Sequence, residues 1–232
     1  MEFVFHKELN TDIWEGTELK PEIREKLLAI AQSFYDYIGV EFTLIDVIFT
    51  GSLANYNYTS SSDIDLHLVY SPAMEGWKED GADPVIKELF DAKKSLWNEH
   101  HDIEIKGHPV EVYLQDSEEA HFSTGVYSLV ADEWLLEPSA DEPEIDMASV
   151  HNKAESMMVM IDKALSDEDV DKIDAVKKKI KVLRQSGLEK DGQYSVENLA
   201  FKTLRNSGYL EKLSDAGREA LDKELSLESA ER

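Results

Sequence analysis

The chain contains no cysteine among its 232 residues. This absence excludes disulfides, a cysteine nucleophile and zinc or iron–sulfur sites built on thiolates, and it fits a reducing, cytoplasmic setting. No stretch approaches the roughly 20 apolar residues of a membrane-spanning helix. The opening "MEFVFHKELN" also lacks the charged, apolar and small-residue regions of a signal peptide. We therefore expect a cytoplasmic protein with no membrane partner.

Positive charge is scarce. The chain has 24 Lys and Arg against 49 Asp and Glu, which gives a formal net charge of −25. Such a field repels nucleic acid and argues against long nucleic-acid tracks as partners. Residues 172–212 reverse the sign, with ten Lys or Arg and five Asp or Glu. This basic segment is either a solvated helix face with ion pairs between turns or a seat for an RNA end.

The first half of the chain predicts a mixed arrangement of helices and strands. "KPEIREKLLAIAQSFYDYIG" has a helical apolar period and ends at Gly39, whereas "VEFTLIDVIFT" and "DIDLHLVY" are typical of strands. A second helix is predicted over residues 84–100, followed by a hairpin with runs at 103–106 and 110–114 around Gly107-His108-Pro109. The inward side chains expected for that second helix are Val85, Leu89, Phe90 and Leu96.

The second half predicts helices alone. The Pro- and acid-rich "LEPSADEPEIDMAS" separates the halves, and helices are expected over residues 150–165, 167–187, 195–206 and 214–227. Ser166, Ser195 and Ser214 stand where helices should start, and Gly187 and Gly208 where they should end. The predicted class is α+β: a small mixed β-sheet backed by helices over residues 1–138, followed by an all-helical domain over 139–232.

Two aspartates alternate along the strand "DIDLHLVY". Side chains at i and i+2 share a face of a strand, so Asp63 and Asp65 should project together. Close carboxylates repel each other, and a divalent cation relieves that repulsion. Magnesium commonly uses one or two carboxylates while substrate phosphates complete its shell. The pair therefore predicts a magnesium site, with manganese as a substitute, that also binds a nucleotide.

The residues before the aspartates suit a phosphate. Gly51 permits a sharp turn after the strand, and Ser52 offers a hydroxyl and a backbone N–H at the start of a short helix in "LANYN". A third carboxylate is expected from a later alternating strand. Glu111 in "PVEVYL" and Glu104 in "DIEIK" both fit, and we choose Glu111 because its run is longer and more apolar.

Cations are also needed near a triphosphate. Lys202 and Arg205, three residues apart on one helix face, are the first choice, and residues 177–181 are the second. His67 shares the face of Asp65 and either reaches substrate or fills the sheet face. His108 and its neighbours at 100 and 101 match no zinc spacing and are expected on the surface. Tyr113 either packs or stacks on a base.

Residues 49–114 contain one motif: Gly51-Ser52, then ten residues, then Asp63-Ile64-Asp65, and then a later apolar–acid–apolar strand. This motif resembles that of the polymerase beta nucleotidyltransferase superfamily. The segments "LNTDIWEGTELKPEIREKLLAIAQSF" and "YSVENLAFKTLRNSGYLEKL" are similar to small stand-alone members of phage or bacterial type. The resemblance implies a nucleotidyltransferase core. It implies that Asp63 and Asp65 bind two magnesium ions, and that Glu111 binds the catalytic one.

It further implies that Gly51 and Ser52 hold the β- and γ-phosphates of a nucleoside triphosphate such as ATP. An acceptor hydroxyl would then attack the α-phosphorus and release pyrophosphate. The acceptor stays open among a small molecule, a protein hydroxyl and an RNA end. Two other interpretations also remain: a catalytically inactive nucleotide- or protein-binding module on the same fold, and a sugar-nucleotide transferase with a metal-binding Asp-x-Asp.

Overall fold

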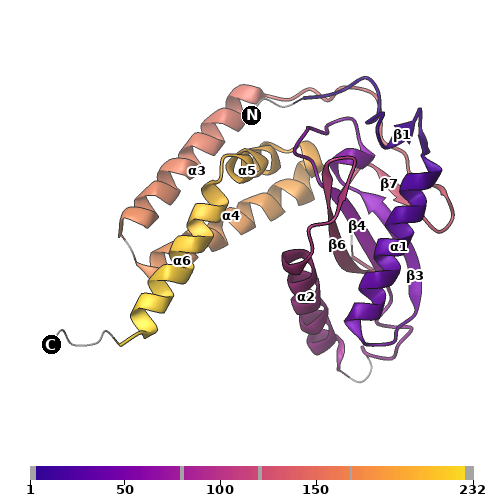
Figure 1. The fold of residues 1–232 in the computed structure, drawn as a ribbon. Helices are drawn as coiled ribbons and strands as arrows, with labels where there is room; N and C mark the ends of the chain where they lie inside the picture. The colour runs from indigo at the N-terminus through magenta and orange to yellow at the C-terminus, as the bar shows by residue number, and fades with distance from the viewer. Residues whose placement is uncertain (1–3, 79–80, 120–121, 168, 228–232) are drawn as a thin grey trace. The chain divides into compact units, whose positions relative to one another are not determined.

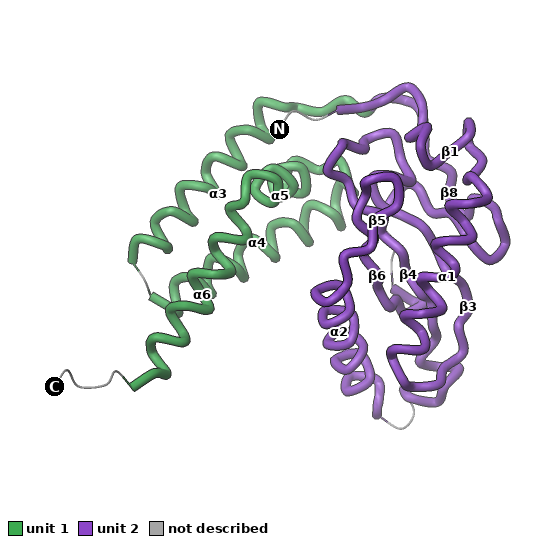
Figure 2. Tube along the Cα trace, viewed as in Figure 1, with its two compact units in different colours: residues 1–3, 143–232 green, residues 4–142 purple. Residues whose placement is uncertain are grey.

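The computed structural model describes residues 4–78, 81–119, 122–167 and 169–227. Contacts divide the chain into two compact units (Figure 2), one spanning Val4–Glu142 and the other containing Pro143–Arg232. The division falls inside the Pro- and acid-rich stretch, slightly beyond the boundary predicted after residue 138. None of the described helices combines the length and the apolarity needed to cross a membrane.

The first unit contains a mixed six-stranded sheet (Figure 1), and its strands are antiparallel except for the pair β4 and β6. This confirms the α+β class with a small mixed sheet. A separate two-stranded ribbon, β1 (Trp14–Glu15) and β2 (Glu18–Leu19), precedes it. In spatial order the strands of the sheet are β5 (Glu104–Ile105), β6 (His108–Asp116), β4 (Ile64–Tyr70), β3 (Leu44–Thr50), β7 (Val126–Ser128) and β8 (Glu133–Leu136).

Two helices of this unit pack on the apolar face of the sheet. Both α1 (Pro21–Ile38) and α2 (Asp83–His100) contribute to the same buried cluster as the core-facing side chains of β4. Phe34 of α1 contacts Trp97 of α2 at 5.5 Å between ring centroids. Tyr70 of β4 contacts Phe90 of α2 at 5.1 Å between centroids. This packing leaves the opposite face of β4 and β6 for polar side chains.

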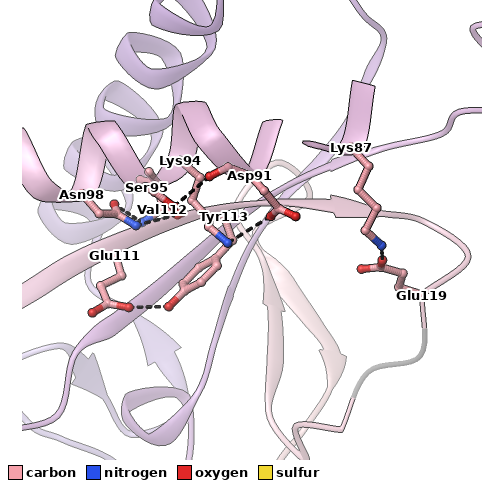
Figure 3. A network of polar contacts seen from close by, with 9 residues as sticks. All are labelled: Lys87, Asp91, Lys94, Ser95, Asn98, Glu111, Val112, Tyr113 and Glu119. Atoms are coloured by element: carbon pink, nitrogen blue, oxygen red, sulfur yellow. Dashed lines mark hydrogen bonds and ion pairs between the residues drawn. The ribbon is translucent and has the colours of Figure 1, made fainter. Parts of the chain in front are cut away.

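The buried face of α2 is narrower than predicted. Phe90 and Trp97 are buried, but Val85, Leu89 and Leu96 are exposed, so the prediction for these three was wrong. Near the end of α2 a polar contact reaches the sheet edge (Figure 3): Asn98 Nδ2 donates to Val112 O at 3.1 Å, and Val112 N donates to Asn98 Oδ1 at 3.0 Å. The helix therefore uses an amide, as well as apolar groups, to hold the sheet.

The hairpin is tighter than predicted. Ile105 pairs with His108, so only Lys106 and Gly107 form the turn, and both have positive φ, 55° and 79°. Positive φ at both central residues defines the type I′ turn, which matches the twist of the strands that it joins. His108 and Pro109 consequently belong to β6 and not to a loop.

The second unit consists of helices α3 (Met147–Asp167), α4 (Val170–Asp191), α5 (Val196–Asn206) and α6 (Tyr209–Leu225). The described residues also form two short 3₁₀ turns: η1 (Ser52–Ala54) lies in the first unit, and η2 (Gly192–Tyr194) lies in the second. Ser195 caps α5 as predicted, because its Oγ accepts from Asn198 N. Ser166 and Ser214 do not start helices: Asp169 caps α4, and α6 begins after Gly208. Gly187 lies inside α4, where a side chain would collide with Glu197.

We expect Asn98→Ala to lower the free energy of unfolding by about 1–3 kcal/mol, because it leaves the Val112 peptide groups without their amide partner. Urea denaturation of the full chain measures this. Ser95→Ala is the matched control, since Ser95 Oγ donates only to Asp91 O within the same helix. Equal losses in the two variants would contradict the edge role of Asn98.

Candidate metal-binding site

The two aspartates lie at the start of β4, on the polar side of the sheet. Ile64, Leu66 and Leu68 alternate into the core and are fully buried. Asp63, immediately before the strand, and Asp65 are both half-buried on the other side. The strand alternation predicted from "DIDLHLVY" therefore gives the two carboxylates a common face.

The third carboxylate comes from the parallel neighbour of β4. Asp65 pairs with Glu111 in the β4–β6 register, and adjacent strands lie roughly 4.8 Å apart. Glu104 instead lies on β5, across β6 from β4, where it pairs with Pro109 and is exposed. The structure thus brings Glu111, and not Glu104, to the aspartates.

Asp63, Asp65 and Glu111 each place one carboxylate oxygen within 4.8 Å of the others'. Within the described residues no second group of three His, Asp or Glu side chains meets this criterion. Oxygens bound to one magnesium lie about 2.0–2.1 Å from it, so two of them are at most about 4.2 Å apart. The 4.8 Å within which the three oxygens lie is close to that spacing. Three hard oxygen donors are the ligand type that magnesium and manganese prefer.

Tyr113, two residues beyond Glu111 on β6, donates its hydroxyl proton to Glu111 Oε2 (Figure 3). Burial, together with the negative charges of Asp65 and Glu111, raises the pKa of the Tyr113 phenol far above its ordinary value. The phenol therefore stays protonated and acts only as a donor to the carboxylate. The sequence predicts either packing or base stacking for this side chain, and its bond to Glu111 was not predicted.

Gly51 lies directly against the Asp65 carboxylate of the cluster. Its backbone has φ 84° and ψ −161°, a region that is essentially restricted to glycine. A Cβ at this position would collide with the Asp65 carboxylate, so that side chain lies directly over the Gly51 backbone. The turn is needed both for its backbone angles and for the space that Asp65 occupies.

Ser52 begins η1, a 3₁₀ turn that ends at Ala54, where a short helix was expected in "LANYN". Its Oγ donates to Ser62 Oγ at 2.8 Å, and Ser62 Oγ also accepts from Thr59 N at 2.9 Å. Hydrogen bonds to Ser62 therefore connect both ends of the segment 52–62 next to the aspartates. The role of Gly51 and Ser52 in binding phosphate stays a prediction.

His108 is buried, so the prediction of a surface position was wrong. Its Nδ1 lies 2.7 Å from Ser62 O, which ties the first residue of β6 to the loop that carries Asp63. The alternation of the sequence could have indicated this burial. His108, Val110 and Val112 are two residues apart along β6, so they share a face of the strand, and all three are buried. His67 fills the sheet face, with Nδ1 2.7 Å from Gln115 Oε1.

Lys202 and Arg205 lie on α5 in the helical unit. Lys202 is half-buried and Arg205 is exposed. Their assignment as nucleotide-binding residues stays a prediction.

Comparisons of the chain with protein-family models, with curated proteins and with solved structures each find no match. The resemblance to polymerase beta nucleotidyltransferases therefore rests on the motif residues, and their geometry is the evidence on which a function can be argued.

We expect Gly51→Ala to destabilise the protein more than Gly16→Ala does, by about 1–3 kcal/mol, because it adds a collision with the Asp65 carboxylate to the strain of a backbone region that is essentially restricted to glycine. Gly16 is a matched control with φ 62° and no heavy atom within 4 Å of an added Cβ. Its substitution costs only the strain of a left-handed backbone. Urea unfolding of both variants checks the difference, and equal losses would show that Asp65 does not need the space over Gly51.

Proposed function

We propose that this chain is a metal-dependent nucleotidyltransferase, which transfers a nucleoside monophosphate from a nucleoside triphosphate to a hydroxyl acceptor and releases pyrophosphate. The observation that carries the proposal is the convergence of Asp63, Asp65 and Glu111, whose oxygens lie within 4.8 Å of one another. Three negative charges at this spacing repel each other, and a bound divalent cation relieves the repulsion.

Asp63, Asp65 and Glu111 are the residues that would hold magnesium or manganese. When bound, the ion would neutralise charge at the phosphates and would favour the alkoxide form of the attacking hydroxyl. The three carboxylates determine where the ion is held. On the same face of the sheet, a carboxylate can also accept the proton of the attacking hydroxyl. Glu111, on the neighbouring strand, faces the aspartates from the side.

Gly51 and Ser52 support the nucleotide part of the proposal. Gly51 brings its backbone against the Asp65 carboxylate, and Ser52 follows it directly with a hydroxyl already oriented by Ser62. Phosphate oxygens bound here would lie next to the metal ligands, as the motif resemblance implies.

A cavity beside the cluster leaves room for a small acceptor. It has a volume of about 380 Å³ and lies between α2 and the later residues of β4 and β6. His67 and Tyr113, the next pair on the same face of the sheet after Asp65 and Glu111, form part of its wall. Lys87 and Lys94 also line it, but each is paired with a carboxylate, Glu119 and Asp91 respectively. This favours a small molecule over an RNA end.

We expect Asp63→Asn to lower nucleotidyl transfer by at least about 100-fold, more than the 10–100-fold typical when an outer partner of a metal site is removed. The assay incubates the full chain with each α-labelled triphosphate, magnesium or manganese, and the metabolite, protein or RNA fraction of a cell lysate. Label in one fraction identifies the acceptor class.

Glu104→Gln is the matched control, because Glu104 is an exposed acid on the edge strand outside the cluster. It should transfer label like the wild type. Wild-type activity in Asp63→Asn would rule out the proposed site. Nucleotide binding that ignores magnesium, without transfer, would instead support an inactive binding module.

A further inference from the structure

We propose that Tyr113 is a positioning residue, which orients the Glu111 carboxylate for the cation and thereby sets the metal affinity of the cluster. This inference rests on the proposed function, since it assigns a role at the same metal site. It starts from the hydrogen bond that Tyr113 donates to Glu111 Oε2 (Figure 3). Tyr113 itself is not one of the three converging oxygen donors.

The hydrogen bond restricts a carboxylate that would otherwise rotate. Each ionised carboxylate has two oxygens and about four lone-pair positions. Tyr113 occupies one position at Oε2 and leaves the others, including those of the second oxygen, for a cation. A ligand held in this way loses less freedom when the metal binds, which is how outer partners raise metal affinity.

Two neighbouring side chains, His67 and Lys94, lie close to the Tyr113 ring. On the sheet, Tyr113 pairs with His67 in the β4–β6 register, and their ring centroids are 4.8 Å apart. Gln115 fixes that imidazole, with Oε1 2.7 Å from His67 Nδ1. The oxygen accepts, so Nδ1 carries the hydrogen.

From α2, Lys94 places its Nζ 5.4 Å from the centre of the Tyr113 ring. The positive charge of an ammonium group at this distance is attracted to the face of an aromatic ring. Lys94 Nζ also pairs with Asp91 Oδ1 at 3.1 Å, which keeps the ammonium near the ring (Figure 3). A side chain braced by His67 and Lys94 presents its hydroxyl in one direction, as a positioning residue must.

The test uses Mn²⁺ alone as the probe, added to the full chain without nucleotide, with bound ion measured by electron paramagnetic resonance and water-proton relaxation. Tyr113→Phe keeps the ring but removes the hydroxyl, and we expect it to weaken Mn²⁺ binding about 10–100-fold. Tyr127→Phe is the matched control. Tyr127 lies in the same sheet and donates to Asp132 Oδ1 at 3.0 Å, outside the cluster. Its Mn²⁺ affinity should equal that of the wild type.

A double-mutant cycle separates positioning from general structural support. If Tyr113 acts through Glu111, Tyr113→Phe should have no further effect on Mn²⁺ affinity once Glu111→Ala has removed the acceptor. A merely structural role would lower affinity in both backgrounds. Urea unfolding verifies that each variant is folded, and Tyr113→Met, which also lacks the hydroxyl, replaces Tyr113→Phe in the cycle if that variant is unfolded.

The outcomes distinguish this inference from the proposed function. If the wild type does not bind Mn²⁺, or binds it no better than Asp63→Asn does, the metal site and the role of Tyr113 both fail. If Asp63→Asn abolishes binding but Tyr113→Phe binds like the wild type, only the role of Tyr113 is overturned. The same holds if Tyr113→Phe weakens binding equally with and without Glu111.

Discussion

The parallel pairing of β4 with β6 is the constraint on which the candidate site depends. Parallel strands cannot be joined by a tight turn, so the chain must cross over between them, and here α2 lies in that crossover. The register that results sets Asp65 beside Glu111 and His67 beside Tyr113. A slip of one residue would turn Glu111 toward the core and a buried valine toward Asp65. The apolar alternation of both strands opposes that slip.

The loop that leads into β4 is constrained as tightly as the strand. Gly51 must leave room for the Asp65 carboxylate, and Ser62, directly before Asp63, joins Ser52 through its hydroxyl and His108 through its carbonyl. A polar loop bonded to η1 and to β6 holds Asp63 near Asp65 without burying either charge deeply. Stability and the placement of the carboxylates therefore come from the same contacts at this edge of the sheet.

Much of this arrangement follows from local pattern. The alternation of "DIDLHLVY" predicts the shared face of Asp63 and Asp65, and the longer apolar run predicts that Glu111 lies on the strand next to them. What pattern did not reveal is non-local. The exposure of Val85 depends on how α2 packs against the rest of its unit, and the bond from Tyr113 to Glu111 depends on side-chain rotamers. The hydrophobic periodicity of the sequence predicts neither feature.

The contact between Asn98 and Val112 also bears on how the protein behaves at high concentration. Strand β5 covers only the first residues of β6, so the backbone that follows would present unpaired groups at the sheet edge. The Asn98 side chain satisfies both the N–H and the C=O of Val112, as a neighbouring strand would. A strand from a second molecule consequently finds this position taken, and the amide acts as a stop to intermolecular β-pairing and aggregation.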